Sequence, residues 1–264
     1  MIILTFVLGG LGFPIVVNIL KFLKYKIVTL FTSKKRKYRP CVLNLDSRIT
    51  LVTTLSISIV AFIVFYFLEY NTTLAEHSEF GKMVTALLGA TTPRTAGFNT
   101  IDTAAMEFPT LMMVLLLMWI GASPQSTGGG IKTSTFAIAT LNILSLAKGK
   151  SKIEIFRREI ADISVRRAFA IMSLSLIVIG SAIILISFLD PEKQLIDIAF
   201  ECFSAYSTVG LSLGITGDLS NASKFVIIVV MFVGRINMLS LVIAVFTKIK
   251  HKNYSYPKEE ITIN

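Results

Sequence analysis

Cysteine, histidine and charge are all scarce in this sequence. Its 264 residues include two cysteines, Cys41 and Cys202, and two histidines, His77 and His251. So few Cys and His residues, far apart, exclude a disulfide-rich scaffold and a metal cluster built from them. Charged residues make up 16% of the chain and hydrophobic residues 53%, whereas soluble domains carry about 25% charge. The composition therefore excludes an ordinary soluble enzyme and a disordered chain.

Long hydrophobic runs indicate the fold class. A helix that crosses the hydrocarbon core of a bilayer needs about 20 apolar residues, and several runs approach that length. The sequence predicts an all-α integral membrane protein with several spanning helices. The runs cover about 2–20, 49–68, 109–122, 168–189 and 225–247.

Positive charge is concentrated between these runs. Residues 21–48, 131–167 and 235–264 hold 22 of the 26 Lys and Arg residues, and 10 of the 16 Asp and Glu residues lie outside them. The positive-inside rule places the three basic segments in the cytoplasm. A net charge of +10 also fits a nucleic-acid-binding protein. Basic segments that alternate with hydrophobic runs favour membrane topology instead, so we expect no nucleic-acid partner.

A glycine pattern occurs twice. TAGFNT around Gly97 is similar to TVGLSL around Gly210, and MWIGAS around Gly121 is similar to MFVGRI around Gly234. The interval from Gly97 to Gly210 is the same as the interval from Gly121 to Gly234. FVLGGLG near the start is a partial third copy, since Gly9 precedes Gly121 by almost the same interval. Two matched spacings indicate an internal duplication.

Each copy has the same order of elements. Apolar helices at 49–69 and 167–189 are followed by an acidic turn and by short half-apolar segments at 80–92 and 193–205. A segment this short forms a helix of about 20 Å, which cannot cross the bilayer and must turn back within it. A second apolar helix follows the glycine motif. The order predicts tandem helix–pore-helix–helix repeats of a cation pore.

The duplication also divides the chain into segments. We expect the last transmembrane helix of an incomplete repeat, a basic cytosolic linker, a complete repeat, a second cytosolic linker, another complete repeat and a cytosolic tail. Their expected boundaries are 1–32, 33–48, 49–147, 148–165, 166–250 and 251–264.

The repeated glycine motif has the chemistry of a selectivity filter. A dehydrated alkali cation needs a ring of oxygen ligands, which backbone carbonyl groups supply. Consecutive carbonyls that point the same way need a backbone conformation that glycine adopts at little cost. One such glycine also fits a plain turn, but two at matched positions favour a filter with K⁺ at the carbonyls of Gly97 and Gly210. The predicted filter residues are Thr95, Ala96, Gly97, Phe98, Thr208, Val209, Gly210 and Leu211.

The second helix of the first complete repeat is interrupted by GASPQSTGGGIKTS. Pro124 and three successive glycines do not continue a helix comfortably. The break follows the predicted filter on its cytoplasmic side, which predicts a gate; a static kink is the alternative. A phosphate-binding loop is disfavoured, because Ile131 separates Gly130 from Lys132 and the preceding run is a membrane helix. The predicted gate residues are Ser126, Thr127, Gly128, Gly129, Gly130 and Arg235.

Three charged residues lie in or beside apolar segments. Arg235 follows Gly234 inside a hydrophobic run, where a charge usually faces water or a partner. It is either a pore-facing cation or half of a structural salt bridge. Glu201 on the second pore helix is expected to accept hydrogen bonds from backbone N–H groups and support the filter. Arg94 is expected to be structural, at the outer mouth.

These motifs resemble a known family. TTPRTAGFNT, IGASPQSTGGGIKTST, FECFSAYSTVGLS and MFVGR are similar to segments of the Trk/Ktr/HKT superfamily of potassium transporters, especially the Ktr-type membrane (B) subunit. The resemblance implies four repeats around one pore, of which this chain resembles the third, the fourth and the last helix of the second. It implies filter glycines at 97 and 210, an intramembrane gating loop at 122–131 and a pore-lining Arg235. Gln125 departs from the glycine that family members often carry.

The resemblance also implies a function and partners. It implies potassium uptake across the plasma membrane, a homodimer, and a cytosolic regulatory ring that binds ATP/ADP or NAD, with no cofactor on this chain. Two filter segments cannot close a fourfold pore, so we expect a truncated chain, with another polypeptide or a second copy as alternatives. The alternative functions are a non-conducting structural subunit and a sodium-selective or sodium-coupled transporter of the same family. No catalytic constellation predicts an enzyme.

Overall fold

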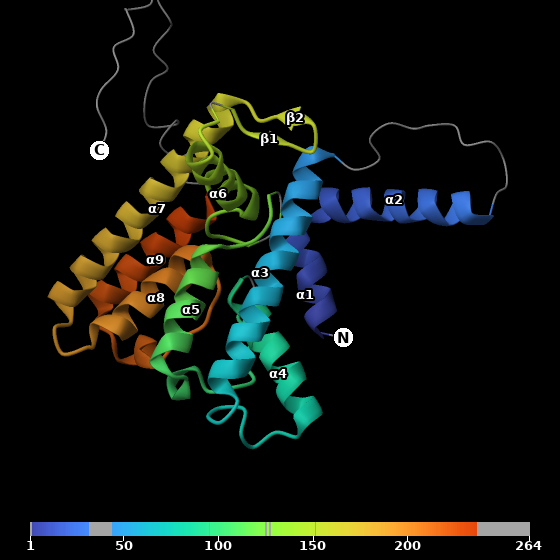
Figure 1. Ribbon diagram of the computed structural model, residues 1–264. Helices are drawn as coiled ribbons and strands as arrows, with labels where there is room; N and C mark the ends of the chain where they lie inside the picture. The colour runs from blue at the N-terminus through green and yellow to red at the C-terminus, as the bar shows by residue number, and fades with distance from the viewer. Residues whose placement is uncertain are drawn as a thin grey trace, which may run out of the picture.

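A computed structural model describes residues 2–31, 44–94, 96–124, 126, 128–150 and 152–236. Two predicted site residues, Thr95 and Thr127, lie outside the described residues, as do the tail at 251–264 and most of the linker at 33–48. The described part is built from helices with one two-stranded hairpin (Figure 1). The all-α fold class is confirmed.

The first complete repeat begins with three α-helices in the expected order. They are α3 (Leu45–Glu69), α4 (Glu79–Thr91) and α5 (Phe108–Trp119). Ser78 caps α4, because its Oγ accepts a hydrogen bond from the backbone N–H of Gly81 at 3.3 Å. After a loop the chain continues into α6 (Thr133–Ala147).

The second repeat has the same plan. Its described part contains α7 (Asp162–Leu189), α8 (Leu195–Ser207) and α9 (Asn221–Arg235). The short helices α4 and α8 each have 13 residues. The first residues of α5 and α9 are separated by the same interval as Gly97 and Gly210. The duplication seen in the glycine motif is thus repeated in the helix positions.

The start of the chain differs from the single helix expected over 2–20. It forms α1 (Ile2–Leu11) and α2 (Phe13–Phe31), whose axes are bent by 104°. Gly12 lies at the bend with a φ of 78°, a left-handed conformation that glycine tolerates. Pro14 follows, and it has no N–H to continue the helical hydrogen bonds. Figure 1 shows α2 extending away from the other helices.

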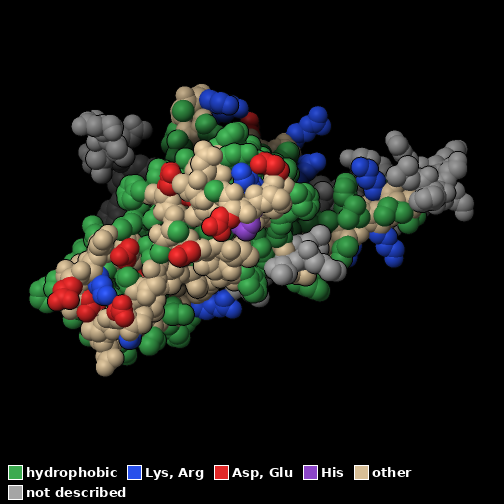
Figure 2. Space-filling model, turned by 90° about the horizontal axis from the view of Figure 1, so that it is seen from below, with side chains coloured by type: hydrophobic (Ala, Val, Ile, Leu, Met, Phe, Trp, Pro, Cys, Tyr) green, Lys and Arg blue, Asp and Glu red, His purple; other side chains and the backbone are tan. Residues whose placement is uncertain are grey.

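Two described helices, α3 and α7, are long and apolar enough to cross a membrane, and the bent pair α1–α2 is a third candidate. The helices α5 and α6 are shorter apolar helices separated by the loop. Figure 2 shows several Asp and Glu side chains on the end of the molecule that is lowest in Figure 1. The chain is a membrane protein.

Apolar clusters hold the helices of each repeat together and connect the two repeats. One core cluster joins α7, α8 and α9, and another joins α3 and α4. A third cluster lies between α5 and α8 and includes Val114, Met118 and Phe200, so it connects the two repeats. The indole Nε1–H of Trp119 donates to the Ser175 hydroxyl at 3.0 Å, which fastens the end of α5 to α7.

A small hairpin closes the end opposite the acidic loops. Strands β1 (Glu154–Ile155) and β2 (Arg158–Glu159) pair antiparallel. The flanking Ile153 and Ile160 are buried in a cluster with residues of α3 and α6. The hairpin therefore covers these helix ends on the side that carries the predicted cytosolic linkers.

Candidate functional site

The two predicted filter segments lie side by side. Gly97 approaches the main chain of the other segment so closely that a Cβ at position 97 would overlap the carbonyl oxygen of Val209 and lie 3.5 Å from the Cα of Gly210. Gly97 and Gly210 have φ angles of 63° and 91°, which L side chains adopt only with strain. Two loops from different repeats thus meet through backbone that requires glycine.

Each segment is fastened to the end of its own pore helix. In the first repeat, the Thr92 hydroxyl donates to the carbonyl oxygen of Phe98 at 2.7 Å. In the second, the backbone N–H of Gly210 donates to the Ser204 hydroxyl at 3.2 Å, and that of Val209 donates to the Ser204 carbonyl at 3.0 Å. Both segments therefore turn back at the ends of α4 and α8.

Side chains of the second segment point into the protein. Val209 and Leu211 are buried in the cluster between α5 and α8. Phe98 in the first segment is more exposed, and its ring lies 6.5 Å from that of Phe6 on α1. These packed apolar side chains offer no ligand atoms to a cation, so the donors available at Val209 and Leu211 are backbone oxygens.

The loop at 121–131 begins and ends at the same place, because its two ends contact each other; we call this contact its neck. Ile120 and Ile131 form a parallel β-bridge, and the backbone N–H of Ile131 donates to the carbonyl of Trp119 at 3.1 Å. A Cβ at Gly121 would overlap the carbonyl oxygen of Gly129. The glycine of the MWIGAS motif is required by this close approach of the two sides of the neck.

The same loop lies against the end of α8. The backbone N–H of Gly129 donates to Thr208 Oγ1 at 3.0 Å. A Cβ on Gly129 would lie 2.6 Å from that oxygen and 2.8 Å from the carbonyl oxygen of Ser207, and Gly130 has a φ of 69°. The glycines of the loop thus allow direct contact with the first residue of the predicted second filter.

Two further contacts hold the loop in place. Ser123 donates to the carbonyl of Gly10 on α1, through both its backbone N–H and its hydroxyl. Lys132 Nζ donates to the carbonyl oxygen of Gly128 at 2.5 Å. The loop is therefore bound on three sides, by α1, by α8 and by its own following residue.

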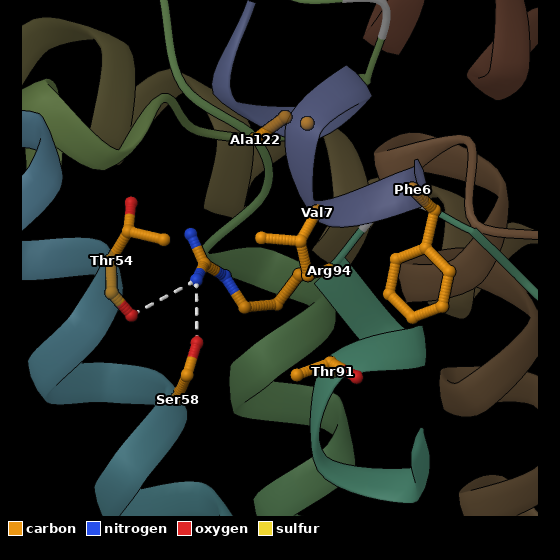
Figure 3. Close-up of a pocket in the computed structure, with 8 residues that line it drawn as sticks. Phe6, Val7, Thr54, Ser58, Thr91, Arg94 and Ala122 are labelled. Atoms are coloured by element: carbon orange, nitrogen blue, oxygen red, sulfur yellow. Dashed lines mark hydrogen bonds between the residues drawn. The ribbon is translucent and has the colours of Figure 1, made fainter. Parts of the chain in front are cut away.

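Arg94 is buried, and it connects the first filter region to the neck of the loop (Figure 3). Its guanidinium donates to the Thr54 carbonyl at 3.4 Å and the Ser58 hydroxyl at 3.3 Å on α3, and to the Gly121 carbonyl at 3.4 Å. The expectation of a residue at the outer mouth is therefore corrected. Arg94 lies three positions before Gly97 but turns inward, between α3 and the loop.

A small cavity of about 30 Å³ borders this guanidinium. Phe6 and Val7 of α1 form part of its wall, with Thr91 and Ala122 (Figure 3). Within the described part of the chain, Arg94 Nε and Thr54 Oγ1 have no hydrogen-bond partner. The space is large enough for about one water molecule.

Arg235 is the last residue of α9 and is exposed. It lies close enough to Lys132, which follows the loop, for the two positive charges to repel each other. Gly234 beside it packs tightly, because a Cβ there would overlap the carbonyl oxygen of Tyr206 on α8. The glycine of the MFVGR motif, like Gly121, is thus required by a close backbone approach.

Glu201 lies in the middle of α8 and is 5% exposed. It accepts a hydrogen bond from the Ser212 hydroxyl, not from the backbone N–H groups expected from the sequence. The partner therefore lies two positions beyond Gly210, on the far side of the filter segment.

A pair of carboxylates was missed by the sequence analysis. Glu69, at the end of α3, accepts from the backbone N–H of Glu107 at 3.1 Å, and Asp190, just after α7, accepts from that of Ser220 at 3.2 Å. These N–H groups belong to the residues that cap α5 and α9. The two caps repeat at the interval of the glycines, but the two acids are further apart, so a fixed-spacing comparison does not reveal them.

Among the described residues, no group of three or more His, Cys, Asp or Glu side chains is arranged to hold a metal ion. The candidate site is instead made from main-chain atoms, hydroxyl groups and glycines. This donor set suits a weakly held monovalent cation that must enter and leave.

The chain is similar to known cation transport proteins. Residues 1–256 match the family model described as TrkH, cation transport protein. The chain is 34% identical to the Ktr system potassium uptake proteins D and B of Bacillus subtilis, over 98% and 97% of its length and 55% and 54% of theirs. It is also 34% identical to the potassium/sodium uptake protein NtpJ of Enterococcus hirae, over 97% of its length and 54% of that relative.

A solved structure has the same fold. The potassium transporter TrkH of Vibrio parahaemolyticus aligns with a TM-score of 0.68 and 19% identity, over 92% of this chain and 51% of that protein. The chain thus spans about half the length of the relatives it matches. Because the family model matches residues 1–256, nearly the whole chain, the chain belongs to the TrkH cation transport protein family.

Proposed function

We propose that this chain contributes two filter segments to a potassium pathway across the plasma membrane. The approach of Gly97 to Val209 carries the proposal, because it brings two loops with positive-φ glycines together through their backbones. In a selectivity filter, backbone carbonyl oxygens replace the hydration shell of an alkali cation, and we propose this role for the carbonyls of the two loops. Three relatives named as potassium or potassium/sodium uptake proteins support potassium as the ion.

Two filter segments supply only part of a ring of oxygen ligands. Relatives about twice as long have room for further segments, so we propose that the rest of the ring comes from sequence that this chain does not contain. Assembly as a homodimer and control by a cytosolic nucleotide-binding ring follow from the family resemblance and are part of the same proposal.

The loop at 122–131 is the proposed gate. It contacts the second filter segment through the bond between Gly129 and Thr208, and its neck is held by the bond from Arg94 to Gly121. One hydrogen bond contributes about 0.5–1.5 kcal/mol, so this attachment can be broken by a modest change elsewhere. Arg235 adds positive charge beside the loop, which raises the barrier to a cation.

Rubidium uptake in a bacterium without its own potassium uptake systems tests this function. The chain is expressed alone, and together with the part of the Bacillus subtilis Ktr D protein that it does not match. We expect uptake from the pair, inhibited by K⁺ more strongly than by Na⁺, and a roughly tenfold weaker preference, about 1.4 kcal/mol, in Gly210→Ser.

The same assay separates the competing functions. Assembly of the pair without uptake points to a structural subunit, and stronger inhibition by Na⁺ points to a sodium pathway of the same family. Deletion of Gly128–Gly130 is expected to raise uptake, and Arg235→Ala to change its rate. Uptake that is unaltered by Gly97→Ser and by Gly210→Ser contradicts the filter assignment.

A further inference from the structure

We propose that Glu201 is a positioning residue for the filter, acting through Ser212 on the outer ends of both filter segments. The inference rests on the proposed function, since it assigns a role within the same pathway. The first observation is that Glu201 is buried. A carboxylate 5% exposed in the middle of a pore helix is costly unless it is hydrogen-bonded. Within the described part of the chain no Lys or Arg is paired with it, and the Ser212 hydroxyl is its partner.

Ser212 connects the pore helix to the filter exit. It lies two positions after Gly210, and its hydroxyl donates to Glu201 Oε1. The same hydroxyl accepts from the backbone N–H of Gly214 at 2.9 Å and lies 3.0 Å from Thr216 Oγ1. The turn that follows the second filter segment is therefore stabilised by hydrogen bonds within the turn and by one hydrogen bond to α8.

The hydrogen bonds of Ser212 extend to the first repeat. The Thr103 hydroxyl donates to the carbonyl oxygen of Ser212 at 2.6 Å, across 109 residues of sequence. Thr103 is 3% exposed and begins a short 3₁₀ turn that Asp102 caps. The Ser212 carbonyl thus accepts a hydrogen bond from the loop that follows the first filter segment, and the Ser212 hydroxyl donates one to the second pore helix.

The repeats differ at this point. Asn99 occupies the position of Ser212 in the first repeat, and its Oδ1 accepts from the backbone N–H of Ile101 at 3.2 Å, so the local turn is present in both. The position of Glu201 is occupied by Leu88. The carboxylate is therefore present in the second repeat alone. In our proposal, Glu201 supports the outer ends of both filter segments.

The discrimination of a filter between K⁺ and Na⁺ depends on how its oxygen atoms are arranged around the ion. Removing the hydrogen bond between Glu201 and Ser212 makes the residues just beyond Gly210 more mobile. Because Thr103 is hydrogen-bonded to Ser212, the first segment becomes more mobile as well. We expect discrimination to fall while assembly and ion entry persist. A purely structural role would lower uptake of K⁺ and Na⁺ together.

Three variants test this inference: Glu201→Leu, which copies Leu88, Ser212→Ala, and the double variant. Hydrogen exchange of the full chain in lipid nanodiscs reports on 208–218 without needing transport. Each single variant is expected to speed exchange there by roughly threefold or more, the loss of one hydrogen bond, and the double variant to add little. Ser181→Ala, whose hydroxyl donates to a carbonyl within α7, is the matched control.

Uptake by the complete assembly gives the second readout. The K⁺ over Na⁺ preference is expected to drop about fivefold in Ser212→Ala and Thr103→Val, and to be retained in Thr103→Ser, which keeps the hydroxyl. If no assembly transports rubidium, the proposed function fails while hydrogen exchange still tests the hydrogen bonds of Ser212. Unchanged exchange in both single variants, or unchanged preference in a transporting assembly, overturns the inference.

Discussion

Gly97 and Val209 meet backbone to backbone, with the Cα of the glycine facing the carbonyl oxygen of the valine. No side chain fits between them, and the φ of 63° at Gly97 also favours glycine. Gly210 differs: its φ is 91°, but a Cβ added there would meet no other heavy atom within 4 Å. The two glycines are therefore required for different reasons.

Gly97→Ala is expected to destabilise the protein more than Gly210→Ala. The first variant combines left-handed strain of about 1–2 kcal/mol with an overlap worth about 1–3 kcal/mol, and the second has the strain alone. Thermal unfolding in detergent measures the difference. Gly217→Ala, which has open space and an ordinary φ, is the control. Equal destabilisation at 97 and 210 would show that the segments do not touch.

Thr208→Val is expected to increase rubidium flux through the assembled pathway. The variant keeps the shape of the side chain but removes the acceptor of the Gly129 N–H. The loss of about 1 kcal/mol shifts the loop roughly fivefold towards its released state. Thr208→Ser keeps the hydroxyl and should behave as the original protein. An equal fall in flux for both variants would mean that Thr208 acts on the filter and not on the loop.

Arg94→Lys is expected to lower stability by about 1–3 kcal/mol. The guanidinium reaches α3 and the Gly121 carbonyl at once, and a lysine ammonium lacks this fork of donors. Thermal unfolding of the purified chain measures the loss. Arg167→Lys, at an exposed position of α7, provides the comparison. Equal unfolding temperatures for the two variants would argue against a link between filter and loop.

Asp190→Asn is expected to flatten the acid side of the stability profile. Hydrogen bonding by Ser223, and then by Ser220, lowers the pKa of Asp190. A carboxyl whose pKa is lowered in the folded state stabilises the fold above its unfolded pKa of about 3.9, and that contribution is lost as the pH falls through the folded value. Unfolding temperatures between pH 6 and about pH 3 measure it. Glu192→Gln, at an exposed position of the same turn, should leave the profile unchanged.

Much of the architecture follows from features that the sequence carries locally. Hydrophobic length predicted α3 and α7, and the repeated interval between the glycine motifs predicted which loops correspond. The bend at Gly12 was not predicted, because an apolar run looks the same whether it is straight or folded. A glycine followed two positions later by Pro14 was the available signal.

Side-chain partners were harder to predict than positions. Arg94 was expected at the outer mouth because it precedes the filter glycine, but the direction of a side chain depends on α3, which is distant in sequence. Glu201 was expected to support the filter, yet its partner is the Ser212 hydroxyl. Such contacts join segments whose separation in the chain says nothing about their separation in space.

The position of the transported ion tests the central proposal most directly. Crystals of the assembled transporter, grown in rubidium or thallium salt, locate the ion by anomalous scattering. The account predicts a peak beside the main-chain oxygens of Gly97 and Gly210, reduced when Na⁺ replaces most of the heavier ion. A peak on side-chain carboxylates, or an ion path that avoids both glycines, would contradict it.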